Sequence, residues 1–173
     1  MDIENKNLSE ILLGREERVE IRKKLSEIYK TSLVCFTLNI PGADKNSPLF
    51  IKVHETGIEA LKKETCKYGM KIVYEQFGKS AAGPEAFFCI DAEPLEIKKL
   101  TVSIEENHKL GRLFDFDVFD KDDKHLDRVK LGFPERKCFI CGERVAICSR
   151  SRRHSVNELL NKIYHAIDEY YQL

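Results

Sequence analysis

Two aspartates lie two positions apart in the segment GRLFDFDVFD, residues 111–120. Because alternate side chains of a β-strand point to opposite faces, we expect Asp115 and Asp117 on one face and the neighbouring apolar residues on the other. Adjacent carboxylates resist burial unless they share a cation. Their oxygens suit Mg²⁺ bound together with substrate phosphates, which is typical of phosphoryl and nucleotidyl transfer. The alternative is an acidic edge strand whose exposed face prevents sheets from associating.

A cluster of metal-ligand residue types follows in the segment CFICGERVAICSRSRRH. Its spacing is Cys138-x2-Cys141-x6-Cys148-x5-His154. Three sulfurs and one imidazole are the number and kind of ligands of a closed tetrahedral Zn²⁺ site, so structural zinc is one interpretation. The second half of the spacing is irregular, and the alternative is free thiols with Cys148 buried at the foot of a strand.

The same segment is strongly basic, and within it Glu143 is the one acid. Arginine presents a planar fork that pairs with phosphate, and a helix expected to begin near Ser155 favours an anion at its N-terminus. This pattern indicates a site for a phosphorylated ligand, and the alternative is a solvated charge run. The basic residues are Arg136, Lys137, Arg144, Arg150, Arg152 and Arg153.

Weaker candidates lie elsewhere in the chain. The segment GKSAAGPE, residues 78–85, departs from a phosphate-binding P-loop because no helix follows it, and it is either a ligand-approach loop or a flexible hairpin. Arg15 and Arg18 share one helix face and either contact a phosphate or an acidic partner, or only solvate the helix. His108 is either a base near the aspartates or a helix-end cap.

Composition sets limits on the class of protein. The chain has 173 residues, of which 42% are hydrophobic, enough for one domain, residues 1–173, with small additions. Its 29 basic and 29 acidic residues cancel, which argues against a general nucleic-acid or membrane coat. No leader pattern or membrane-length apolar run is present, so we expect a cytoplasmic protein with reduced thiols. The remaining cysteines are expected in the core: Cys35, Cys66 and Cys89.

Hydrophobic periodicity predicts an α+β fold. A helix over 8–28 with a break near Gly14 precedes strand, helix, strand, strand, helix, strand, and an amphipathic helix ends the chain. This order is typical of a ferredoxin-like βαββαβ sheet with its helices on one face. The first and third strands would then be central, with the aspartates near Asn39 on the open face of the edge strand. The expected ranges are strands 32–40, 70–77 and 86–92, a fourth strand in the segment 111–120, and helices 48–69, 94–111 and 155–171.

Together these motifs resemble a known family. The stretches HKLGRLFDFDV, ERKCFICGERVAICSRSRRH, LLGREERVEIR and AAGPE are similar to those of the apo-citrate lyase phosphoribosyl-dephospho-CoA transferases. The resemblance covers most of the chain, although Lys109 stands where proline is expected. It implies transfer of a prosthetic group from 2'-(5''-triphosphoribosyl)-3'-dephospho-CoA to a serine of the citrate lyase acyl carrier subunit, with release of diphosphate.

The resemblance also suggests roles for individual residues. Mg²⁺ on Asp115 and Asp117 would offset the triphosphate charge and polarise the phosphorus that the serine attacks. His108 would accept the serine proton. The residues expected to hold the donor are Arg112, Arg150 and Arg152 for the polyphosphate, Arg15 and Arg18 for donor or carrier, and a loop through Gly83 and Glu85 for the ribose.

Two non-catalytic functions remain as alternatives. One is a zinc-stapled basic module that binds nucleic acid or a phosphorylated partner. Phe139 is the one aromatic residue beside the arginines, which counts against single-strand binding. The other is an assembly factor that docks on the citrate lyase carrier without catalysis.

Overall fold

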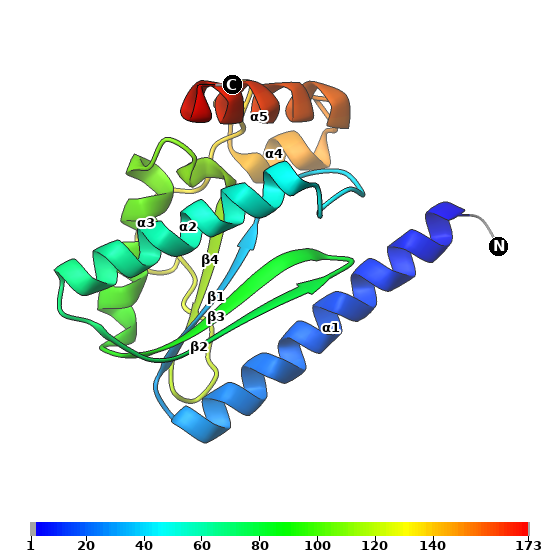
Figure 1. Cartoon of the computed structure of the whole chain (residues 1–173). Helices are drawn as coiled ribbons and strands as arrows, with labels where there is room; N and C mark the ends of the chain where they lie inside the picture. Colours follow the sequence, from blue (N-terminus) through cyan, green and yellow to red (C-terminus); the bar gives the residue numbers. More distant parts are fainter. Residues whose placement is uncertain (1–2, 173) are drawn as a thin grey trace.

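The computed structural model describes residues 3–172 and confirms an α+β fold. A four-stranded antiparallel sheet lies between helices (Figure 1). None of the helices in the described part of the chain is long and apolar enough to cross a membrane. The elements are α1 (Ile3–Tyr29), β1 (Ser32–Leu38), α2 (Pro48–Lys67), β2 (Lys71–Ser80), β3 (Gly83–Asp91), α3 (Pro94–Asn107), the 3-10 helix η1 (Gly111–Leu113), β4 (Phe114–Phe119), α4 (Val145–Arg150) and α5 (Val156–Tyr171).

The strands lie in the order β2-β3-β1-β4, and each neighbouring pair is antiparallel. β1 and β3 are central, and β4 forms an edge beside β1. In the register of this edge, Asp115 lies opposite Thr37 and Asp117 lies opposite Cys35. The two aspartates are therefore carried on the outermost strand, next to the middle of the sheet.

One face of the sheet holds the main hydrophobic core. Alternate residues of the strands point toward α2, α3 and α5, and Phe36 and Phe116 stack there with ring centroids 4.3 Å apart. Helix α2 approaches the sheet closely because Gly57 has no side chain: a Cβ there would lie 2.2 Å from Cζ of Phe36. Ser47 caps α2 as expected, since its hydroxyl accepts a hydrogen bond from the N–H of Phe50.

Helix α1 covers part of the second face, so the expectation that this face is open was wrong. Leu25 of α1 packs with Leu33, Cys35, Phe87 and further apolar residues on that side (Figure 1). This second cluster exists because Leu33, Cys35, Phe87 and Cys89 of β1 and β3 are apolar and point to this side, and an apolar part of a sheet face needs a cover.

The predicted helix break at Gly14 was also wrong, because α1 continues through it. Gly14 instead allows a close approach to the β2–β3 hairpin: a Cβ there would lie 2.5 Å from Oγ of Ser80. The hairpin itself is longer than expected. The predicted loop 78–85 is mostly strand, with Gly78 paired to Glu85 and the turn confined to residues 81–82.

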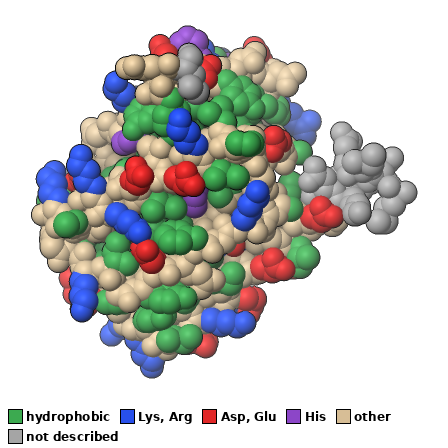
Figure 2. All heavy atoms as spheres, viewed as in Figure 1, with side chains coloured by type: hydrophobic (Ala, Val, Ile, Leu, Met, Phe, Trp, Pro, Cys, Tyr) green, Lys and Arg blue, Asp and Glu red, His purple; other side chains and the backbone are tan. Residues whose placement is uncertain are grey.

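The cysteine predictions are confirmed in part. Cys35 and Cys89 are buried, but Cys66 is exposed because it lies on the outer side of α2. On the face seen in Figure 2, basic and acidic side chains alternate with small apolar areas, as expected for a chain without net charge.

We expect Gly57→Ala to lower the free energy of unfolding by about 1–3 kcal/mol, because the added methyl overlaps Phe36 and forces α2 away from the sheet. Urea denaturation would measure this. Glu55→Ala, at an exposed position of the same helix, is the control and should leave the midpoint nearly unchanged. Equal stability of the two variants would contradict the close packing at Gly57.

Candidate active site

The aspartate pair lies on one face of β4, as predicted. Phe114, Phe116 and Val118 are buried in the main core, while the side chains of Asp115 and Asp117 point to the α1 side and are 35% and 48% exposed. The alternation of the strand thus places two carboxylates where solvent and a ligand can reach them. This is the arrangement that an oxygen-bound cation such as Mg²⁺ requires.

Each aspartate forms an ion pair with one basic side chain among the described residues, and the charge of Lys98 acts on both. Nη1 of Arg136 lies 2.9 Å from Oδ1 of Asp115, and Nε2 of His125 lies 3.1 Å from Oδ1 of Asp117. Both neighbours come from the segment after β4, outside the sheet. The pair is therefore compensated from one side by groups that the sheet does not itself supply.

The two carboxyl groups have divergent pKa values. Burial and then repulsion from Asp117 raise the pKa of Asp115, although Arg136 acts against both. Burial also acts to raise the pKa of Asp117, but the hydrogen bond and charge of His125, together with the charges of Lys98 and Arg136, outweigh it and the pKa lies below its usual value. Asp115 is the carboxyl group that most needs a further positive charge, as expected where two acids share one site.

Glu105 of α3 connects this pair to the edge of the sheet. The side chain is almost completely buried, and its Oε1 accepts a hydrogen bond of 3.0 Å from the N–H of Phe116 in β4. The same carboxylate pairs with Arg136 at 2.6 Å and with Arg128 at 3.2 Å. Nζ of Lys98 donates to the carbonyl of Phe116, so α3 side chains satisfy both outward backbone groups of this residue.

A second ion pair lies between α1 and the sheet. Nε of Arg18 lies 2.8 Å from Oε2 of Glu85, a buried residue of β3. Burial raises the pKa of the Cys35 thiol to about 12, and the charges of Arg18, Glu85 and both aspartates also act on it. The prediction of a loop at these residues was wrong: Glu85 is a strand residue held by Arg18, and Gly83 begins that strand with a φ of +110°. Their contact with the ribose stays a prediction.

His108 is not at the aspartate pair. Its ring packs against Phe114 and Tyr170 at centroid distances of 5.1 and 5.4 Å, on the helix side of the sheet. Its backbone N–H ends α3, and its Nδ1 accepts from the N–H of Leu110, which is the behaviour of a helix-end cap. The expected base role has no geometric support here, because β4 separates His108 from the carboxylates.

The predicted arginine ligands are spread over several places. Arg112 lies over the ring of Phe139, 5.3 Å from its centroid, and its Nη2 is buried without a hydrogen-bond partner among the described residues. Arg15 and Arg150 are exposed. Arg152 adopts a left-handed backbone, φ +46°, beside a hollow of about 550 Å³ next to α5.

The basic cluster is partly neutralised by acids. Arg136 is held by Glu105 and Asp115, and Arg144 pairs with Glu135 at 3.3 Å. The remaining members are exposed: Lys137, Arg150, Arg152 and Arg153. A continuous basic surface for nucleic acid is not what this arrangement provides.

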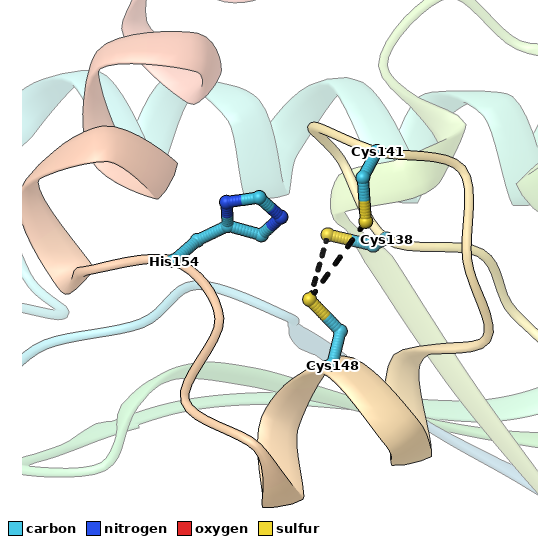
Figure 3. A group of neighbouring side chains, drawn as sticks. All are labelled: Cys138, Cys141, Cys148 and His154. Atoms are coloured by element: carbon cyan, nitrogen blue, oxygen red, sulfur yellow. Dashed lines mark hydrogen bonds between the residues drawn. The ribbon is translucent and has the colours of Figure 1, made fainter.

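The cysteines and histidine of the second motif converge. Their four ligand atoms all lie within 4.8 Å of one another, and Sγ of Cys148 is 3.5 Å from Cys138 and 3.9 Å from Cys141 (Figure 3). Cys148 lies in α4 and not at the foot of a strand. Sulfurs on a tetrahedral zinc ion are about 3.8 Å apart, so the group fits such an ion.

The pKa of one member of this group also suits a metal. The neighbouring imidazole of His154, and then a hydrogen bond with the backbone of Glu143, lower the pKa of the Cys141 thiol to about 6. A thiolate at neutral pH is the form that binds zinc. Burial and the two neighbouring sulfurs raise the pKa of Cys148 to about 12, so a metal ion would have to displace its proton. His154 has a buried Nε2 without a partner among the described residues, which a metal ion would satisfy.

Comparison with known proteins decides the family. The family model described as apo-citrate lyase phosphoribosyl-dephospho-CoA transferase matches residues 6–170. The chain belongs to this family. A probable transferase of that name from Vibrio cholerae serotype O1 is 38% identical over 165 residues, 95% of this chain and 93% of the relative. One from Escherichia coli O7:K1 is 32% identical over 157 residues, 91% of this chain and 86% of the relative.

The sequence did not predict that three further residues lie at or next to the aspartate pair. Glu105, Arg136 and His125 surround the aspartate pair, yet Arg136 had been assigned only to the basic cluster. A signal for Glu105 was present in the pattern, because it is an acid on the apolar side of the helix that ends before β4. Nothing in the sequence indicated the return of residues 125 and 136 to this strand.

We expect the pKa of Asp115 in this transferase to fall when Asp117 is replaced by asparagine, because the substitution removes a neighbouring negative charge and keeps the side-chain shape. Carboxyl-carbon NMR titration of the wild type and of Asp117→Asn would measure it. Asp122→Asn, at an exposed loop position, should leave the Asp115 titration unchanged. An unchanged Asp115 pKa in Asp117→Asn would show that the two groups do not interact.

Proposed function

We propose that this chain attaches the phosphoribosyl-dephospho-CoA group to apo-citrate lyase. The observation that carries the proposal is membership of the transferase family over residues 6–170, with an exposed aspartate pair on the edge strand. The donor is 2'-(5''-triphosphoribosyl)-3'-dephospho-CoA. The acceptor is a serine hydroxyl of the acyl carrier subunit. We place this reaction in the cytoplasm, away from membranes.

The reaction breaks a phosphoanhydride bond of the donor and forms a phosphoester bond to the carrier. The serine oxygen forms a bond to the donor phosphorus next to the ribose, the bond from that phosphorus to diphosphate breaks, and the serine proton is lost. Asp115 and Asp117 would hold Mg²⁺, which would supply charge neutralisation at the phosphates. Their positions two residues apart on a strand let both carboxylates face the same ion.

Arginines from several places on the chain are the candidates for holding the polyphosphate. Arg112 is the first candidate because its buried Nη2 has no partner among the described residues, and a phosphate oxygen would give it one. Arg150, Arg152 and Arg15 are exposed and free to contact donor or carrier. Arg18 is a weaker candidate, since Glu85 already pairs with it.

The fold and the second motif have roles consistent with this activity. The strand order β2-β3-β1-β4 supports assignment to the ferredoxin-like class within one domain. We also propose Zn²⁺ on Cys138, Cys141, Cys148 and His154, as a structural ion that fixes the segment between β4 and α5. A closed set of protein ligands leaves no position for substrate, so this ion would not take part in the reaction.

The basic-module alternative is not favoured. Two of its arginines, Arg136 and Arg144, are engaged by acids, and the family is one of transferases. The docking-only alternative differs from catalysis in one respect. A docking protein would need the carrier surface but not the aspartate pair.

We expect the purified protein, with Mg²⁺, donor and apo acyl carrier subunit, to increase the carrier mass by one phosphoribosyl-dephospho-CoA group. Asp115→Asn and Asp117→Asn should slow this gain by about a hundredfold or more, because they remove charge that stabilises the transition state. Intact mass spectrometry measures the gain, and Asp122→Asn is the control. Carrier binding should persist in both variants. No gain with folded protein and authentic carrier would contradict the transferase activity.

We expect the purified chain to contain about one zinc ion, because the cluster offers a complete ligand set. Cys148→Ser should lose the ion and lower the melting temperature. Cys66→Ser removes an exposed cysteine of α2 and should leave the zinc content and the melting temperature unchanged. Elemental analysis and thermal unfolding are the measurements, and a zinc-free wild type with an unchanged melting temperature after chelation would contradict the site.

A further inference from the structure

Arg136 divides its guanidinium between two carboxylates. Nη2 lies 2.6 Å from Oε1 of Glu105, and Nη1 lies 2.9 Å from Oδ1 of Asp115. The side chain is 23% exposed and Glu105 is 5% exposed, so the Glu105 half of this pairing is the better shielded from water. A planar fork can hold two acids at once in this way, and it can give up one without losing the other.

Glu105 is fixed independently of Arg136. Its Oε1 accepts from the N–H of Phe116, and Oε2 pairs with Arg128, which is itself paired with Glu106 at 2.7 Å. The carboxylate would therefore stay in place if Arg136 released Asp115. By contrast, Asp115 is a partly exposed side chain. Among the described residues Arg136 is its one ion-pair partner, and Lys98 acts on it by charge without an ion pair.

We propose, building on the proposed function, that Arg136 is a built-in counter-cation that competes with the metal ion for Asp115, and that Glu105 is the positioning residue that draws Arg136 away. Without a ligand, Arg136 neutralises part of the charge on the aspartate pair. When Mg²⁺ arrives with the donor triphosphate, the ion takes the carboxylate. Arg136 stays on Glu105 with its freed Nη1 directed to the new phosphate charge.

This arrangement would couple metal binding to donor binding. A divalent ion alone meets a fixed positive charge beside Asp115, which opposes its binding. The donor brings the negative charge that reverses this opposition, because Arg136 then gains a phosphate partner. The metal would accordingly bind weakly by itself and firmly with the donor.

A purely structural salt bridge predicts the opposite sign for metal binding. If Arg136 only braces the strand, its removal disorders Asp115 and weakens the metal site. If Arg136 competes, its removal strengthens the site. The direction of the change in metal affinity therefore separates the two roles.

The experiment measures Mn²⁺ binding to the full chain without donor, by the electron paramagnetic resonance signal of free Mn²⁺, which occupies oxygen-ligand sites like those of Mg²⁺. We expect Arg136→Gln to bind Mn²⁺ about fivefold to tenfold more tightly than wild type, the size of one partly screened charge interaction. Arg136→Lys keeps the charge and should return the affinity toward the wild-type value. The double variant Asp115→Asn, Asp117→Asn gives the binding at other places on the chain.

Glu105→Gln supplies a second test, in which the Mn²⁺ affinity should change in the opposite direction. The amide oxygen can still accept from Phe116, but the charge that draws Arg136 away is lost, so Mn²⁺ should bind several-fold more weakly. Arg144→Gln removes an arginine paired only with Glu135 on the surface and should bind like wild type. Thermal unfolding identifies any variant that fails to fold, and the other variant then carries the test.

Unchanged or weaker Mn²⁺ binding in folded Arg136→Gln, or unchanged binding in folded Glu105→Gln, would overturn the proposal. So would the absence of binding in both wild type and Arg136→Gln. The carrier mass assay is independent of these results. A wild type that modifies the carrier while Arg136→Gln binds Mn²⁺ no better leaves the transferase standing and removes only the role of Arg136.

Discussion

The hydrogen bond from the N–H of Phe116 to the buried carboxylate of Glu105 is the constraint on which the site depends. An edge strand has backbone groups without a neighbouring strand, and here side chains of α3 supply the partners. That solution places a negative charge beside the strand, and the charge in turn requires Arg128 and Arg136. The α3 side chains that satisfy the backbone of the edge strand thus also determine which charges surround Asp115.

The two faces of the sheet have different roles. One face carries aromatic and aliphatic residues that pack under α2 and α3 and make the fold stable. The other is mixed: apolar near Leu33 and Phe87, where α1 lies, and acidic where Glu85 and the aspartates stand. Because β-strand alternation separates these two functions by a single residue, Phe116 can be a core residue between two acids of the site.

Local patterns in the sequence were sufficient for most of the fold and part of the site. Period-two alternation placed Asp115 and Asp117 on one face, and the ligand types of the second motif indicated that Cys138 and His154 converge. Local patterns do not predict contacts between residues far apart in the sequence. Glu85 was expected in a loop because its ion pair with Arg18, 67 positions earlier, leaves no local signal. Gly14 reads as a helix break for the same reason, since Ser80, which it contacts, lies far along the chain.

The acids of the second face are neutralised from opposite ends of the chain. Glu85 pairs with Arg18, which precedes it near the N-terminus, whereas Asp115 pairs with Arg136, which follows it in the sequence. During synthesis, all four strands can therefore leave the ribosome before the cation of the edge strand does. The aspartates of the nascent edge strand would stay without their ion-pair partners and hydrated until the segment after β4 emerges, so this part of the face is completed last.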